Sequence, residues 1–249
     1  MGRYSAILAA SGGPKMQRRV VAFLAFFMLA LAPASELAYA ADAKPFITAE
    51  NLDLASLLPP PPANDSAQTK AELGEVLTLQ VTRTPEMEAR AKADAVEDIW
   101  RFADIVGPKF TKDALPKFAA FFDRVVETEG AVVDPAKNAW KRTRPHLYSD
   151  LVKPVVPLSK SGSYPSGHAT VGTLMGIVLS NMLPEMRAQI MARAWDYANN
   201  RVVGGIHFRS DIEAGRIAGT VIAATIMTRD DFTSEFAAAK SELRAVLGH

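Results

Sequence analysis

Apolar residues recur every three or four positions along most of the chain, the spacing that places them on one face of an α-helix. In residues 115–128, for example, Phe118, Phe121, Phe122 and Val125 fall on one face. This periodicity predicts α-helices over residues 65–81, 84–106, 115–128, 166–182, 184–200, 211–228 and 230–247, and a shorter helix that begins at Asp134-Pro135. Residues 211–228 are strongly apolar, so we expect them to form the central, buried helix.

Residues with preferences for helix ends mark the boundaries of these segments. Thr84-Pro85 is a helix cap followed by a first-turn proline. Gly130 is expected to end the helix over residues 115–128, because glycine is common just after a helix end. Asp230 or Asp231 is expected to cap the last helix, because a carboxylate at a helix start accepts hydrogen bonds from free backbone N–H groups.

Signals for β-strands are nearly absent. Residues 152–158 alternate poorly and contain prolines, and no internal repeat is found. The pattern therefore predicts an all-α fold: a single-domain multi-helix bundle over residues 64–249, preceded by an extended N-terminal arm over residues 41–63. The prolines at 59–62 make that arm stiff, so we expect it to lie as a strap over the domain surface.

Residues 1–40 have the pattern of a secretory signal peptide. The stretch 16–19, MQRR, carries two positive residues, thirteen apolar residues follow from Val20 to Ala32, and Ala38-Tyr39-Ala40 gives a cleavage site. Met16 is the better start of translation. A membrane anchor is the alternative, but a spanning helix needs about 20 apolar residues. We therefore expect export to the periplasm or outside a bacterial cell, and no membrane association of the mature form.

Composition narrows the chemistry. The chain has 28 Lys and Arg, 27 Asp and Glu, no Cys and four His. The absence of Cys excludes disulfides, thiol catalysis and thiolate metal sites. A net charge of +1 gives no strong field, so no nucleic-acid partner is expected. The histidines are dispersed and have few acidic neighbours, so no metal site is predicted.

Three segments carry candidate chemistry, and the first holds two cations. Lys137 and Arg144 are seven residues apart, and Pro145 follows. On one helix, two turns separate Lys137 from Arg144, so both would share a face and could hold an oxyanion. Pro145 would then force the chain to leave the helix. A solvated basic helix face is the alternative explanation of this segment.

The second segment, residues 162–170, reads GSYPSGHAT and opens an apolar helix. Ser166 and Gly167 lie where the first backbone N–H groups of a helix are unpaired, an arrangement that favours anion binding. His168 would lie in the first turn, beside a bound anion. An ordinary serine cap with a satisfied histidine would explain the segment equally well.

The third segment combines Arg201, His207 and Asp211. His207 and Asp211 are four residues apart and would be neighbours on a helix. Asp211 would then fix the tautomer of His207 and leave Nε2 bare as a nucleophile or base. A structural His–Asp pair with a surface arginine is the alternative.

Together, the three segments suit a phosphate-sized anion, because they supply several cations, backbone N–H groups and two imidazoles. Of the imidazoles, one has a carboxylate orienter (Asp211, for His207) and one, His168, does not. The motifs K-x-x-x-x-x-x-R-P, P-S-G-H and R-x-x-x-x-x-H-x-x-x-D, in this order, resemble the type 2 phosphatidic acid phosphatase superfamily. That group includes bacterial non-specific acid phosphatases and vanadium haloperoxidases.

GSYPSGHAT, the length of the exported chain and the LLPPPP arm look most like the class A bacterial acid phosphatases. Two positions depart from the family pattern: Asn200, where Ser is usual, and Ala169, where Thr is commoner. Because Asn200 can still donate a hydrogen bond, we expect a changed activity rather than a lost one.

The resemblance implies an exported acid phosphatase with no cofactor, acting on small phosphate monoesters and assembling as a homo-oligomer. It makes His207 the nucleophile that forms a phosphohistidine, with His168 as proton donor and Asp211 as orienter. The residues that bind the phosphoryl group would be Lys137, Arg144, Ser166, Gly167 and Arg201. A vanadium-dependent haloperoxidase on the same scaffold is the alternative, although such enzymes are usually larger. A phosphate-binding protein without turnover is a third possibility.

Overall fold

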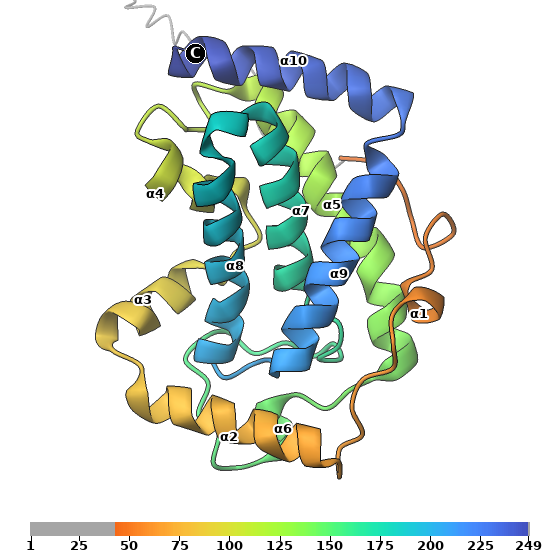
Figure 1. Cartoon of the computed structure of the whole chain (residues 1–249), viewed down its shortest axis with the longest axis vertical. Coiled ribbons are helices and arrows are strands. Elements are labelled where there is room, and N and C mark those ends of the chain that lie inside the picture. Colours follow the sequence, from red (N-terminus) through yellow and green to blue (C-terminus); the bar gives the residue numbers. More distant parts are fainter. Residues whose placement is uncertain (1–42, 249) are drawn as a thin grey trace, which may run out of the picture. The chain divides into compact units, whose positions relative to one another are not determined.

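A computed structural model describes residues 43–248 of the chain. The predicted signal peptide, the Met16 start and His249 lie outside the described residues. Within 43–248 the fold is all-α, as predicted, and contains no β-strand (Figure 1). The elements are α1 (Leu54–Leu57), α2 (Ala67–Thr82), α3 (Pro85–Ala93), the 3-10 helix η1 (Ile99–Phe102), α4 (Ala103–Val106), α5 (Pro116–Trp140), α6 (Pro145–Tyr148), α7 (Gly167–Met182), the 3-10 helix η2 (Pro184–Met186), α8 (Arg187–Val203), α9 (Arg209–Ile226) and α10 (Asp230–Leu247). None of the helices in this part of the chain has the length and hydropathy to cross a membrane.

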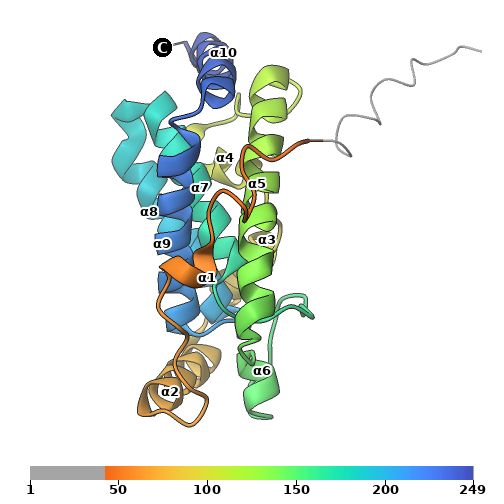
Figure 2. The same cartoon turned by 90° about the vertical axis from the view of Figure 1, so that its right-hand side faces the viewer.

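The centre of the bundle is α7, and not α9 as the apolar stretch 211–228 predicted. Nearly every residue of α7 is buried, and α8 and α9 both pack along it (Figures 1 and 2). In α9, Ile212, Ala218 and Ile222 are buried on one face, whereas Ile217 is exposed on the other. An apolar stretch is therefore compatible with a half-buried helix as well as with a central one.

Glycines bring these helices close together. A Cβ atom at Gly215 of α9 would lie 2.6 Å from the carbonyl oxygen of Ser166, directly before α7. A Cβ atom at Gly219 would collide with the carbonyl oxygen of Thr170. On the other side of α7, a Cβ atom at Gly176 would lie 2.7 Å from the Cβ of Ala194 in α8. The absence of side chains at these positions fixes α7 against both of its neighbours.

Helix α5 is longer than predicted. The predicted end at Gly130 and the predicted separate helix at Asp134-Pro135 are both wrong, because one helix continues through them to Trp140. Pro135 has no N–H to donate to the carbonyl of Ala131, four residues before it. That carbonyl instead accepts a hydrogen bond from the backbone N–H of Ala49 in the N-terminal arm, at 3.2 Å. A partner outside the helix thus compensates for the proline inside it.

The predicted helix over residues 84–106 is broken into three pieces. Helix α3 ends at Ala93 because the next residue, Asp94, is buried and binds Arg193 of α8 through two hydrogen bonds of 2.7 and 3.0 Å. The chain resumes as η1 at Ile99 and as α4 directly afterwards. The residues between α3 and η1 are thereby available to the site described below.

The described part of the arm lies against α5. The backbone N–H of Phe46 donates to Thr128 Oγ1 at 2.9 Å, and the ring of Phe46 packs edge-on against Phe232 of α10. Further along, Pro59 accepts a hydrogen bond from the Tyr164 hydroxyl at 2.7 Å. The arm includes the short helix α1, whose Leu54 is buried.

Two helices cross the ends of the bundle, α10 at one end and α2 at the other (Figures 1 and 2). Ser66, one of the two residues (Asp65 or Ser66) that the sequence offers as a cap, caps α2 by accepting from the Thr69 N–H. At α10 the prediction of an aspartate cap is wrong, because Arg229 occupies the cap position and Asp230 and Asp231 lie in the first turn. Their charges still favour the positive end of the helix dipole.

Candidate active site

Four helix ends meet at the α2 end of the bundle. The C-terminal ends of α5 and α8 carry Lys137 and Arg201 in their last turns. The N-terminal ends of α7 and α9 carry His168 and Asp211 in their first turns. Because helix N-termini bear partial positive charge, both the helix dipoles of α7 and α9 and the two cations favour an anion here.

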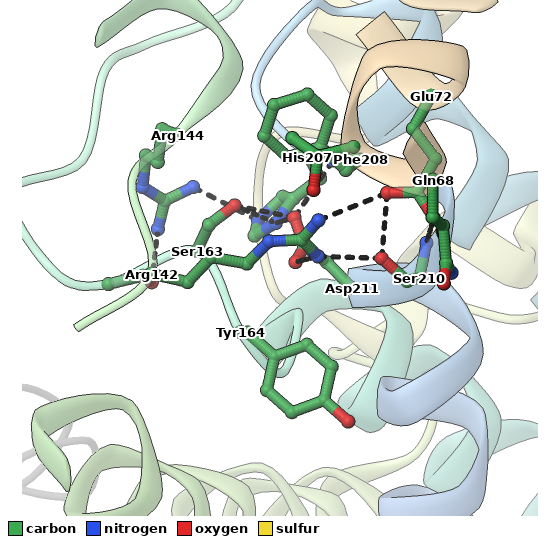
Figure 3. Close-up of polar contacts among 12 residues, drawn as sticks. Gln68, Glu72, Arg142, Arg144, Ser163, Tyr164, His207, Phe208, Ser210 and Asp211 are labelled. Atoms are coloured by element: carbon green, nitrogen blue, oxygen red, sulfur yellow. Dashed lines mark hydrogen bonds and ion pairs between the residues drawn. The ribbon is translucent and has the colours of Figure 1, made fainter. Parts of the chain in front are cut away.

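His207 lies in this region, two residues before α9 begins. The spacing predicted that His207 shares a helix with Asp211. In the structure His207 precedes that helix. The two side chains still meet, with His207 Nδ1 and Asp211 Oδ2 3.3 Å apart (Figure 3). On the other side of the ring, Nε2 lies 3.0 Å from Arg144 Nη1.

These two contacts define the protonation of the imidazole. A guanidinium can only donate, so Nε2 must accept and carry no proton, and the proton on Nδ1 points to Asp211. Burial, followed by the charges of Arg144 and Arg201, holds the pKa of His207 well below its ordinary value of 6.5. The ring is therefore neutral, with its free electron pair on Nε2.

Asp211 is completely buried and is met by several donors. It accepts hydrogen bonds from Arg142 Nη1 at 2.6 Å, Ser163 Oγ at 2.5 Å and the Phe208 N–H at 2.8 Å, in addition to His207 (Figure 3). Burial raises the pKa of Asp211 to about 6, and the charge of Arg142 opposes that rise. The donors fix the orientation of the carboxylate and, through it, that of the imidazole.

Arg142 extends this contact into a chain of alternating charges. Its Nη2 binds Glu72 Oε2 of α2 at 3.0 Å, and Glu72 also accepts from the Ser210 hydroxyl at 2.7 Å. The sequence analysis missed both Arg142 and Glu72. Arg142 lies two residues before Arg144 in the first motif, a signal that could have been used, whereas nothing in the pattern of α2 distinguishes Glu72 from a surface glutamate.

Lys137 and Arg144 do not share a helix face, contrary to the prediction. Helix α5 ends at Trp140, and Lys141 adopts a left-handed conformation with φ 47°, so Arg144 lies beyond the helix. Three backbone carbonyls, of Ser161, Gly162 and Ile206, accept from the Arg144 guanidinium. Burial lowers the pKa of Arg144 to about 10, which leaves it charged.

Arg201 is a cation of the site with buried N–H groups that lack a hydrogen-bond acceptor. Its side chain is buried, and Nε and Nη1 have no hydrogen-bond partner. Burial also lowers the pKa of Arg201. A buried charged donor without an acceptor is costly, so these atoms fit a negatively charged group that is bound from solution.

Ser166 and Gly167 lie at the start of α7, as predicted. Ser166 caps the helix by accepting from the Ala169 N–H at 3.3 Å. A Cβ atom at Gly167 would lie 2.8 Å from both Lys137 Nζ and Glu129 Oε1. A larger residue at position 167 would therefore push these two flexible side-chain ends away from the helix start.

His168 has a carboxylate partner, contrary to the prediction that only His207 does. Its Nδ1 lies 2.9 Å from Glu97 Oε1, and its Nε2 lies 2.9 Å from the carbonyl oxygen of Ala95. Both partners can only accept, so the two contacts together suit a ring that carries a proton on each nitrogen. The ring also stacks on Tyr197. Glu97 was missed because its segment was predicted to be helical.

Asn200, which departs from the family pattern, has a structural partner. Its side-chain amide donates to Asp94 Oδ2 at 2.8 Å, in the buried cluster that Arg193 also joins.

All eight residues named from the motifs lie around one point at the α2 end. Among residues 43–248, no group of three or more His, Asp or Glu side chains has the arrangement of a metal site.

Comparison with known proteins agrees with this arrangement. The model of the PAP2 superfamily matches residues 125–233. A non-specific acid phosphatase of Salmonella typhimurium is 32% identical over 203 residues, which cover 78% of this chain and 81% of that protein. A non-specific acid phosphatase of Providencia stuartii is 28% identical over 228 residues, covering 86% and 90%.

Two solved structures share the fold. A bacterial vanadium-dependent iodoperoxidase superposes with a TM-score of 0.53 at 22% identity, covering 71% of this chain but only 53% of that protein. A transmembrane PAP2-type phosphatidylglycerolphosphate phosphatase of Bacillus subtilis gives a TM-score of 0.51 at 17% identity, covering 73% and 92%. At these identities the likeness concerns the fold alone. The extended similarity to the acid phosphatases, together with the motif residues gathered around His207, means that this chain belongs to the PAP2 superfamily and, within it, to the class A bacterial acid phosphatases.

Proposed function

We propose that the protein is an exported acid phosphatase that hydrolyses phosphate monoesters through a phosphohistidine at His207, without a metal ion. The observation that carries the proposal is the state of the His207 ring, which is buried and neutral and has its free electron pair on Nε2, facing cations. The acid phosphatase relatives support the reaction class.

In the proposed complex, the phosphoryl group lies among Lys137, Arg144 and Arg201, next to the backbone N–H of Gly167. The two unpartnered N–H donors of Arg201 then gain acceptors. Arg144 Nη1 transfers its hydrogen bond from His207 Nε2 to a phosphoryl oxygen. That transfer releases the electron pair of Nε2 and neutralises the charge on the phosphoryl oxygens.

In the first step, His207 Nε2 attacks phosphorus, and the bond between phosphorus and the ester oxygen breaks. The electron pair of that bond goes to the leaving oxygen, which takes a proton from His168. For this, the Nε2–H of His168 turns from the Ala95 carbonyl to the leaving oxygen, while Nδ1–H remains on Glu97. Such general acid catalysis typically contributes about 10²–10⁴-fold in rate.

In the second step, the neutral His168 accepts a proton from water, and the water oxygen attacks phosphorus. The bond between phosphorus and Nε2 breaks, its electron pair returns to His207, and inorganic phosphate leaves. Throughout, Asp211 stabilises the positive charge that develops on the His207 ring.

The test compares the wild-type protein with His207→Ala in the presence of EDTA, using p-nitrophenyl phosphate labelled with ³²P. We expect phosphate release and an acid-labile labelled protein from the wild type in a rapid-quench experiment, and neither from the variant. His146→Ala is the matched control, because His146 is a histidine of α6 with no role in the proposed mechanism, and it should still form the labelled protein. Label trapped on His207→Ala would place the nucleophile elsewhere, and loss of activity in EDTA would contradict the metal-free mechanism.

The remaining parts of the proposal concern the whole chain. We propose residues 1–40 as a signal peptide, residues 41–63 as an arm and residues 64–249 as the catalytic domain of a periplasmic or secreted homo-oligomer. N-terminal sequencing of the exported protein and sedimentation of the purified protein test these points. No observation favours haloperoxidase activity beyond the shared fold, and oxidation of bromide with vanadate and peroxide would reveal it.

A further inference from the structure

The ion pair between His168 and Glu97 lies on the open side of the site. The His207 side chain is 3% exposed, whereas the side chains of His168 and Glu97 are 16% and 34% exposed. The proposed nucleophile is therefore enclosed, whereas the side chains of His168 and Glu97 are in part open to solvent. In an in-line displacement, the leaving group lies opposite the nucleophile, so the alcohol part of a substrate would extend on this open side.

Glu97 carries the negative charge at that opening. Although burial raises the pKa of Glu97, the hydrogen bond and charge of His168 and the charges of Lys137 and Arg201 lower it below its ordinary value. The neighbouring carboxyl of Glu129 differs, because burial and the charge of Glu97 raise its pKa to about 8. In mildly acidic solution Glu129 is therefore neutral, and Glu97 is ionised.

We propose that Glu97 is a specificity-determining residue that selects phosphate monoesters of neutral or cationic alcohols over monoesters whose alcohol part carries a carboxylate or a second phosphate. The proposal rests on the proposed function, since His168 must be the group that faces the leaving oxygen. Every substrate brings the same phosphoryl group to Lys137, Arg144 and Arg201, so these cations do not distinguish one monoester from another by that group. A charge on the alcohol part, in contrast, would lie near the His168–Glu97 pair and within range of the Glu97 charge.

Three substrates of nearly equal size test this idea: 2-aminoethyl phosphate, ethyl phosphate and carboxymethyl phosphate. The measured quantity is kcat/KM for release of inorganic phosphate from each one at a single mildly acidic pH. The wild type should prefer the aminoethyl ester to the carboxymethyl ester. In Glu97→Gln this ratio should fall by about fivefold or more, because one charge at a partly exposed position is removed.

Two further variants separate charge from structure. Glu97→Asp keeps the charge and should retain most of the wild-type preference. Glu88→Gln is the matched control, because Glu88 has the same 34% side-chain exposure and also forms an ion pair, with Lys92 of α3. It should leave the ratio unchanged. The comparison of ratios cancels any general loss of rate caused by a displaced His168, since all three substrates share that loss.

Each result decides a different point. Wild-type activity on all three esters with an unchanged ratio in Glu97→Gln overturns the inference and leaves the proposed function intact. No phosphate release by the wild type from any ester overturns both. Should Glu97→Gln fail to fold, the wild type alone is decisive: its preference should shrink as NaCl is added, and a wild type that prefers the carboxymethyl ester contradicts the role of Glu97.

Discussion

Among the neighbours of Asp211, Arg142 lowers the pKa of its carboxyl the most. Its carboxylate is completely buried, and the Arg142 guanidinium lies 2.6 Å from it. A carboxylate buried without a cation would take up a proton in mildly acidic solution. Arg142 is therefore a positioning residue, because it acts on His207 through Asp211.

Replacing Arg142 by methionine should move the acid limb of the pH profile upwards. The pKa of Asp211 is about 6 with Arg142 opposing its rise, so removal of Arg142 raises this pKa further. A protonated Asp211 is a weaker acceptor for the Nδ1–H of His207. We expect kcat/KM to fall about tenfold more at pH 5 than at pH 7.5, as for a pKa change of about one unit. The profile should be measured from pH 4.5 to 8.

Arg142→Lys keeps a positive charge and should shift the limb less. The double variant Glu72→Gln/Arg142→Met removes the carboxylate that the single variant leaves without its partner, so it guards against simple misfolding. An equal loss of kcat/KM at every pH would mean that Arg142 supports the fold and does not control the ionisation of Asp211.

Motif spacing predicted some residues of the candidate site and not others. Lys137, His168, Arg201 and His207 were found from motifs in distant segments, and the fold brings them together. The partners that set their protonation were not found, because Glu97 and Glu72 lie in segments whose pattern is that of ordinary helix surface. Motif spacing identifies the side chains that we propose to carry out the chemistry, whereas the partners of these side chains are set by tertiary contacts.

Among the helices, the contact of α7 with α9 has the least room to adjust. Backbone atoms of α7 lie directly opposite Gly215 and Gly219 of α9, so an added methyl group would meet carbonyl oxygens rather than flexible side chains. The same contact holds Ser166 beside Asp211, where the Ser166 N–H donates to the Asp211 carbonyl oxygen at 3.0 Å. A change that alters the packing of α7 against α9 should therefore also displace Ser166 relative to Asp211.

Gly219→Ala should destabilise the protein, although alanine has the higher helix propensity. Overpacking typically costs about 1–3 kcal/mol, which outweighs a gain of about 1 kcal/mol from helix propensity. Gly130→Ala is the matched control, since Gly130 is also inside a helix and has nothing within 4 Å of the added Cβ. The control should be as stable as the wild type or more so. Urea unfolding measures both, and equal stability of the two variants would contradict the close-packing argument.

Helix boundaries were predictable where the residue that sets the boundary is close in sequence. They were not predictable where a residue far away in the sequence sets the boundary. The predicted starts of α2, at Asp65 or Ser66, and of α7, at Ser166, agree with the serine caps Ser66 and Ser166, because a serine cap acts on the next three residues. Pro135 stays inside α5 because the backbone N–H of Ala49, far away in the sequence, donates to the Ala131 carbonyl, a hydrogen bond that Pro135 cannot make. Asp94 ends α3 because Arg193 binds it. No local pattern contains these partners.

Within residues 43–248, most of the buried charged side chains lie at one end of the bundle, and the buried Asp94–Arg193 pair between α3 and α8 is the main exception. The end crossed by α10 is packed with aromatic rings, whereas the α2 end buries Arg142, Arg144, Arg201 and Asp211 around the site. Buried charges cost folding free energy unless they are paired. The stability of the protein should therefore depend on pH mainly through this end.

Glu129 gives the clearest test of that dependence. Its folded-state pKa is raised from 4.5 to about 8, so between these values the folded state keeps a proton that the unfolded state has lost. The free energy of unfolding should therefore decrease as pH rises through this window, by up to about 1.4 kcal/mol per pH unit. Glu129→Gln removes this decrease, so its stability relative to the wild type should grow from pH 5 to pH 8. Glu127→Gln, an exposed position on the same helix, should leave the slope unchanged. Urea unfolding at pH 5, 6.5 and 8 measures the three slopes, and parallel slopes for Glu129→Gln and the wild type would mean that Glu129 is already ionised in the folded protein.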